Sequence, residues 1–138
     1  MSREGLTLSE LPGHSFVNRQ KGSGTRLLLD YRLREMGIAT GSIPGYDREL
    51  TTHIGVALAV KTGEAEAGMC VYSAAQALGL PFVPVGKERY EIAFRTADGD
   101  DPRMRALETA ISSPEFREIL SRLGGYATLE TGVRRQVP

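Results

Sequence analysis

Residues 16–26 read Phe16-Val17-Asn18-Arg19-Gln20-Lys21-Gly22-Ser23-Gly24-Thr25-Arg26. The apolar residues at the start of this stretch predict a short strand over 15–18, and the glycine and polar residues after them predict a loop over 19–24. Apolar residues then recur at helical spacing from 25 to 36, and Gly37 supplies the expected end of a helix. A strand, a glycine loop and a helix in this order are typical of an α/β fold.

Helices and strands continue to alternate on both sides of this stretch. We expect one helical turn over 7–11 before it. After it we expect a helix from 51 or 52 to 63, a strand over 64–71, a helix over 73–78, strands over 80–83 and 89–94, and two helices that start at Asp101-Pro102 and Ser113-Pro114. This alternation predicts an α/β sandwich with a largely parallel sheet.

The composition narrows the class of protein. The chain has 138 residues, enough for one domain, and its 41% hydrophobic and 25% charged residues are ordinary for a globular protein. Seventeen basic residues balance seventeen acidic ones, so nothing in the net charge indicates nucleic-acid binding or an anionic membrane surface. The single cysteine, Cys70, excludes an intrachain disulfide and is expected to be a small buried apolar residue.

The sequence carries neither a membrane span nor a secretory signal. No apolar stretch approaches the ~20 residues that a span needs, and the N-terminus lacks the basic and apolar regions of a signal peptide. We therefore expect a cytoplasmic protein, although a periplasmic one whose signal has been removed would look the same.

The glycine loop is the sharpest candidate for a binding site. Backbone N–H groups at a helix start attract anions, Ser23 and Thr25 add hydroxyl donors, Gly24 permits a close approach, and Arg26 raises the local potential together with Lys21. The loop matches neither the Walker pattern nor the dinucleotide fingerprint. The alternative is that Ser23 or Thr25 does no more than cap the helix.

Two further helix starts carry polar groups. Thr52 and His53 follow Thr51 at one of them, and Tyr72 and Ser73 follow a predicted strand at the other, where ligands of open α/β sheets bind. The alternatives are that His53 is a capping or surface residue and that Tyr72 is a packing residue. Since His14 and Cys70 complete no ligand set with His53, we expect no metal. No nucleophile elbow or carboxylate pair is present, so we expect no enzyme activity and no cofactor.

Several motifs in this order resemble a known family. They are residues 16–26 quoted above, Gly45-Tyr46 with Thr52-His53, residues 63–68, residues 78–84, Ser113-Pro114-Glu115-Phe116-Arg117 and Gly125-Tyr126. Together they cover most of residues 6–126. They resemble the periplasmic-binding-protein-like molybdate domain that is attached to DNA-binding regulators and to molybdenum-cofactor biosynthesis proteins, and that is related to the binding proteins of molybdate and tungstate transporters.

The resemblance implies a type II periplasmic-binding-protein-like fold, a three-layer α/β sandwich with an oxyanion between two lobes. It places Ser23, Gly24, Thr25, Thr52, His53, Tyr72 and Ser73 on the ligand, with Arg26 closing the site. It also implies that this single domain, residues 1–138, is mostly one lobe. Residues 6–90 would be the second lobe and 91–138 the segment that returns to the first, so the chain is either a fragment or completes its cleft with a partner.

The function expected from the resemblance is the binding or sensing of molybdate or tungstate. The alternative is a regulatory or interaction module of a transcription factor or cofactor-biosynthesis protein, which binds another small ligand or a protein. The two predicted C-terminal helices carry more apolar surface than one lobe can cover. We therefore expect a homodimer, or contact with the first lobe of a parent protein.

Overall fold

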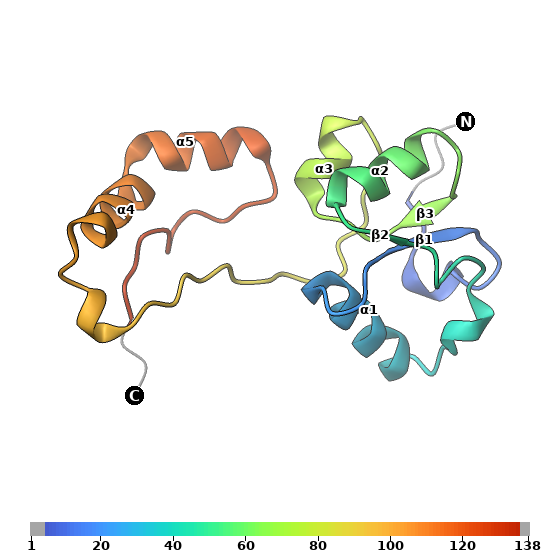
Figure 1. The fold of residues 1–138 in the computed structure, drawn as a ribbon. Coiled ribbons are helices and arrows are strands. Elements are labelled where there is room, and N and C mark those ends of the chain that lie inside the picture. Colours follow the sequence, from blue (N-terminus) through green and yellow to red (C-terminus); the bar gives the residue numbers. More distant parts are fainter. Residues whose placement is uncertain (1–4, 136–138) are drawn as a thin grey trace. The chain divides into compact units, whose positions relative to one another are not determined.

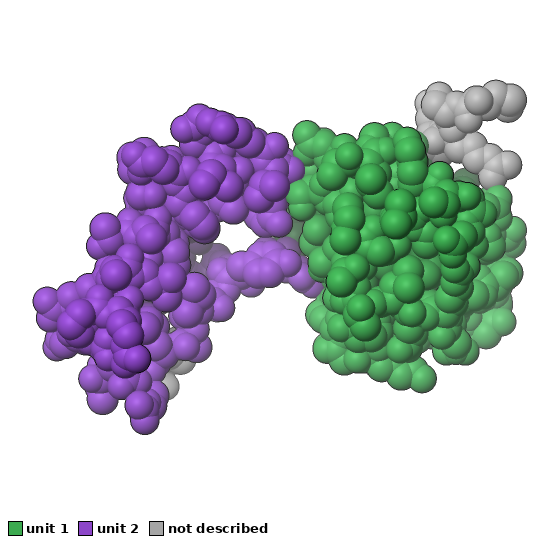
Figure 2. Space-filling view, turned by 45° about the horizontal axis from the view of Figure 1, so that its top comes forward, with its two compact units in different colours: residues 1–87 green, residues 88–138 purple. Residues whose placement is uncertain are grey.

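The computed structural model describes residues 5–135 (Figure 1). The chain divides into two compact units, Met1–Lys87 and Glu88–Pro138, which Figure 2 colours green and purple. The first unit holds the whole sheet, and the second is helical with long irregular segments.

The first unit alternates helices and strands as the sequence predicts. Its elements are the 3₁₀ turn η1 (Leu8–Glu10), β1 (Phe16–Arg19), α1 (Gly24–Glu35), the 3₁₀ turn η2 (Thr40–Ser42), β2 (Glu49–Leu50), α2 (His53–Lys61), β3 (Ala67–Gly68) and α3 (Tyr72–Ala77). The expected helical turn, the first strand and the three helices are therefore confirmed to within a residue or two.

The three strands form one parallel sheet in the order β2-β1-β3. Asn18 of β1 is in register with Glu49 of β2, and Phe16 of β1 with Ala67 of β3. The first strand is therefore central, and the chain leaves it on one side through α1 and crosses to the other through α2. The expected α/β class with a parallel sheet is confirmed.

The core of the first unit lies on both faces of β1. Phe16 packs with Leu29 and Leu33 of α1, whereas its neighbour Val17 packs with Val56 and Ala59 of α2. Successive side chains of a strand point to opposite faces, so α1 covers one face of the sheet and α2 the other (Figure 1). Both helices are thereby anchored with their first residues at the end of a strand.

The second unit contains the 3₁₀ turn η3 (Thr96–Asp98), α4 (Pro102–Ser112) and α5 (Pro114–Leu123). Both predicted helix starts are confirmed: the Asp101 carboxylate accepts from the Arg103 N–H at 2.8 Å, and the Ser113 hydroxyl accepts from the Phe116 N–H at 3.1 Å. No side chain of α4 or α5 is fully buried, and Ile119 of α5 is 53% exposed.

Two predicted strands, over 80–83 and 89–94, are wrong, because the structure has no strand in either range. Pro81 removes a backbone donor from the first range, and Pro84 follows directly after it. In the second, Tyr90 is 71% exposed, so its side chain packs on no neighbouring strand. The strand predicted over 64–71 is present only as the two residues of β3, and Cys70 is half-buried rather than buried.

Candidate functional site

The three predicted groups of site residues lie along one edge of the sheet. The strands of a parallel sheet all end at the same edge, and each strand here is followed by a helix start: β1 by α1, β2 by α2 and β3 by α3 (Figure 1). Because β2 and β3 flank β1 on opposite sides, this edge is also the place where the chain switches sides, which is the usual ligand position in open α/β sheets.

The start of α1 leaves several hydrogen-bond donors free. Ser23 is the N-cap, and its hydroxyl oxygen accepts from the Arg26 N–H at 3.2 Å. Within residues 5–135 the N–H groups of Gly24 and Thr25 meet no acceptor. Ser23 therefore caps the helix, which was the alternative considered for it from the sequence. Its hydroxyl hydrogen remains available to a ligand. Gly22 before it has φ +85°, which favours glycine.

The start of α2 repeats this arrangement. Thr52 is the N-cap and accepts from the Gly55 N–H at 3.0 Å, while the N–H groups of His53 and Ile54 meet no acceptor in the described chain. Nδ1 of His53 is buried without a hydrogen-bond partner. Burial, and secondarily the charge of Arg19, lower the pKa of His53, so its ring is neutral near pH 7.

The start of α3 differs from the other two. Its N-cap is Val71, which has no side chain that can cap, and the helix has six residues. The Tyr72 ring stands edge-on to Phe82 with 5.2 Å between the centroids and is 40% exposed. This contact favours the packing role for Tyr72, and Ser73 beside it is half-buried.

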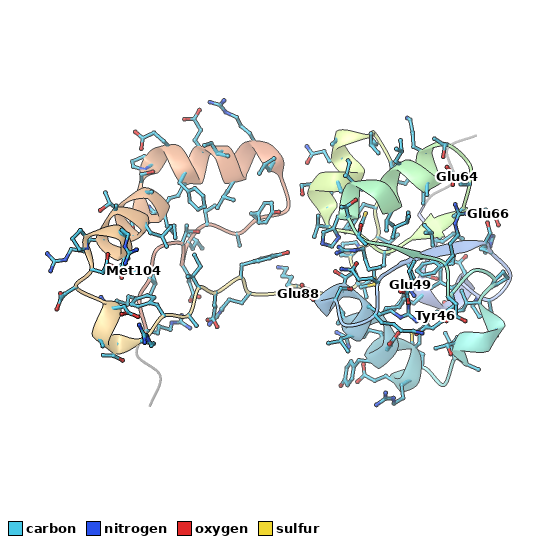
Figure 3. The ribbon with its side chains drawn as sticks, viewed as in Figure 1. Tyr46, Glu49, Glu64, Glu66, Glu88 and Met104 are labelled. Atoms are coloured by element: carbon cyan, nitrogen blue, oxygen red, sulfur yellow. The ribbon has the colours of Figure 1, made fainter. Side chains whose placement is uncertain are left out.

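Arg26 lies beneath the loop and is already paired. Its side chain contacts the carboxylates of Asp30 at 3.1 Å and Glu49 at 3.4 Å, and its guanidinium stacks on the Tyr46 ring at 4.1 Å. Tyr46 and Glu49 are labelled in Figure 3. Since only 3% of Arg26 is exposed, its charge is used to join α1 to β2 and to the loop before it. We assign it a supporting role under the site.

Sequence reasoning missed Arg19, the last residue of β1. Its Nη2 donates to the Thr51 carbonyl at 3.0 Å and its Nε to Gln20 Oε1 at 3.2 Å, while Nη1 is buried without a partner. The residue is 8% exposed. The available signal was its position, since an arginine that ends an apolar strand at the start of a glycine loop faces the ligand edge.

Hydroxyls, backbone N–H groups and one unpaired guanidinium nitrogen form a set of donors suited to an anion. Among the described residues, no group of three or more histidine, cysteine and acidic side chains is arranged to hold a metal ion. The described helices are all too short or too polar to cross a membrane.

A family comparison matches most of the chain. The model of the PBP superfamily domain matches residues 1–112, which include the whole of the first unit and all the site residues discussed above. No solved structure matches the chain significantly.

Two curated relatives also match. "Uncharacterized protein YvgK" of Bacillus subtilis (strain 168) is 34% identical over 116 residues, which make up 84% of this chain and 37% of that protein. "Uncharacterized protein in ferredoxin 2Fe-2S gene 5'region" of Clostridium pasteurianum is 37% identical over 107 residues, 77% of this chain and 95% of that protein. The chain thus matches nearly all of the clostridial relative and little more than a third of the Bacillus one.

Proposed function

The chain belongs to the PBP superfamily, and on that premise we propose that it binds a small oxyanion at the sheet edge of its first unit. Molybdate and tungstate are the ligands we propose, as the motif resemblance implies. Binding involves no catalysis and no cofactor. The protein acts as a sensor or carrier of the anion in the cytoplasm, or in the periplasm if the chain is exported.

One observation carries this proposal: α1 and α2 both start at this edge with unused donors. Gly24 and Thr25 contribute free N–H groups at the first start, and His53 contributes one at the second. The capping hydroxyls of Ser23 and Thr52 keep their hydrogens for a ligand, since each uses only its oxygen in the cap. Helix dipoles add partial positive charge at both starts.

The same proposal extends to architecture. The first unit is taken as one lobe of a type II, three-layer binding protein, and the second unit as the segment that packs on another lobe. Because the chain spans 37% of the length of the Bacillus relative, the activity of a longer protein is part of the proposal as well. The other lobe comes from a partner, either a second copy of this chain or a parent protein.

Isothermal titration with molybdate, tungstate, sulfate and phosphate tests the proposal. We expect saturable heat with at least one tetrahedral oxyanion. An absence of heat with all four, from protein whose NMR spectrum shows a folded first unit, would contradict oxyanion binding.

The site is located by the double variant Ser23→Gly with Thr25→Ala. Glycine is chosen because it replaces serine at an N-cap at a cost of only a few tenths of a kcal/mol. Each lost hydrogen bond to a charged ligand is worth about 1.5–3 kcal/mol, so affinity should fall at least tenfold. Ser113→Gly is the matched control, since Ser113 caps α5 in the second unit in the same way. Unchanged affinity in the double variant would move the site away from α1.

A second candidate function rests on the second unit. Ile119 and Leu123 of α5 are 53% and 48% exposed, an apolar surface suited to another protein. A regulatory or interaction module would use this surface and show no heat with oxyanions.

A further inference from the structure

We propose that Arg19 supplies the countercharge of the oxyanion site, so that the site selects doubly charged oxyanions over singly charged ones of the same size. This inference rests on the proposed function and adds to it the residue that determines ligand charge. Its basis is a buried guanidinium with an unpaired nitrogen at the start of α2.

A buried cation without a partner is unusual in a folded protein. Burial removes a charge from water at a cost of several kcal/mol, and proteins offset that cost with an opposite charge and full hydrogen bonding. Arg19 is 8% exposed, and its guanidinium donates only to the neutral groups of Thr51 and Gln20. No described carboxylate forms an ion pair with it, and Nη1 remains without an acceptor.

Arg26 provides an internal comparison. It is buried to a similar degree, 3% exposed, yet two carboxylates and an aromatic ring surround its guanidinium. The same unit therefore pairs one buried arginine completely and leaves the other open on one side. The difference is explained if the acid that pairs with Arg19 is the ligand.

The free nitrogen lies among the groups already placed at the ligand edge. Nη2 of Arg19 is hydrogen-bonded to the Thr51 carbonyl, directly before the N-cap of α2. Burial, and after it the charge of Arg19, lower the pKa of His53. Burial raises the pKa of the Cys70 thiol, and the Ala75 backbone and the charge of Arg19 offset part of that rise. The hydrogen bond to Thr51 therefore places the Arg19 guanidinium at the start of α2.

With Arg19 in the site, ligands are distinguished by their charge as well as by their shape. Backbone N–H groups and hydroxyls carry no net charge. The difference in affinity that they produce between singly and doubly charged anions of one size is therefore smaller. A buried guanidinium such as that of Arg19 interacts with the full charge of the ligand, roughly in proportion to it. Nδ1 of His53 is also without a partner, and it is a donor when it carries the ring hydrogen, which suits a ligand made only of acceptor oxygens.

Tungstate and perrhenate are suitable probes, since both are tetrahedral oxyanions of nearly equal size with charges of 2− and 1−. We expect titration of the wild-type chain to show a clear preference for tungstate. Arg19→Gln should weaken tungstate binding by about 10- to 100-fold and perrhenate binding by much less, so that the ratio of the two affinities falls. Arg19→Lys keeps the charge and should retain part of that ratio.

Arg48→Gln is the matched control. Arg48 is an exposed arginine of the same unit that pairs with Glu64, which is labelled in Figure 3, beyond the C-terminal end of α2. The Arg48→Gln substitution removes the same charge without touching the start of α2. The affinities for tungstate and perrhenate should both stay within twofold of the wild type.

The outcomes separate the two proposals. If the wild type binds neither anion nor any of the four oxyanions named above, the proposed function fails. If the wild type binds tungstate and Arg19→Gln keeps the same ratio, the function stands and the role of Arg19 is refuted. Should Arg19→Gln not fold, the wild-type NMR spectrum decides: tungstate must shift the guanidinium signal of Arg19 and the ring signals of His53, and bound tungstate without those shifts overturns the inference.

Discussion

Replacing Arg26 by methionine should destabilise the first unit without removing the oxyanion site. Methionine keeps an unbranched stem against the Tyr46 ring and removes the charge. The substitution breaks contacts with Asp30 at 3.1 Å, with Glu49 at 3.4 Å and with the Arg19 carbonyl at 3.4 Å. The first contact lies within α1, and the other two join α1 to β2 and to the end of β1.

The size of the effect follows from how exposed the partners are. Removing one member of a fully buried ion pair costs about 3–5 kcal/mol, because the other charge is left unpaired. Here the side chains of Asp30 and Glu49 are 34% and 29% exposed, so water solvates part of their charge. Asp30 also keeps the Tyr46 hydroxyl as a donor, and Glu49 keeps the Lys21 N–H. We therefore expect a loss of about 2–3 kcal/mol, below the buried limit.

Urea unfolding followed by the amide signals of Phe16 and Asn18 measures this loss in the first unit alone. With a slope of about 1.5 kcal/mol per M, the midpoint should fall by about 1.3–2 M. Arg32→Met is the matched control on the same helix, because the Arg32–Glu35 pair is exposed and worth about 0–1 kcal/mol.

The two roles considered for Arg26 give opposite results. A supporting residue lowers the midpoint and leaves oxyanion affinity, measured in the absence of urea, within a few-fold of the wild type. A midpoint within 0.3 M (about 0.5 kcal/mol) of the wild type, together with lost oxyanion affinity, would refute the supporting role and restore Arg26 to the ligand.

Burial lowers the pKa of His53 on folding, so the unfolded chain takes up a proton first as pH falls below about 6.5. The free energy of unfolding should therefore decrease from pH 7.5 to 5.5 in the wild type and decrease less in His53→Gln. An equal decrease in both proteins would contradict the burial of this ring. Gly45→Ala should destabilise the first unit by more than about 1 kcal/mol in urea unfolding, because Gly45 has φ +82° and an added Cβ would meet the Phe16 carbonyl oxygen. Gly41→Ala is the control and should change stability little, because a Cβ there meets nothing. We propose a homodimer through α4 and α5: light scattering at micromolar concentration should give twice the chain mass and Ile119→Asp should give a monomer, while a folded wild-type monomer would refute the dimer.

Local signals in the sequence predicted the helix starts well. Asp101, Ser113, Thr52 and Ser23 each precede a helix and each accepts a hydrogen bond from an N–H two or three residues ahead. Such a cap depends on a few consecutive residues, so single-sequence reasoning finds it. The strands were predicted less well, because a strand forms only beside a partner: Tyr90 and Ile92 have strand-like alternation but lie exposed, and β3 is paired over only two residues.

The sequence by itself determined the alternation of helices and strands, the helix starts and the glycine loop, because each of these depends on residues close by in the chain. It thereby also determined the donors that are offered to an anion. Only the tertiary structure decided which arginine is free to meet a ligand. Arg26 and Arg19 lie seven residues apart and look equally suited in the sequence. Their partners differ because parallel pairing places Glu49 of β2 beside Asn18, where its carboxylate reaches Arg26, and leaves Arg19 with uncharged groups.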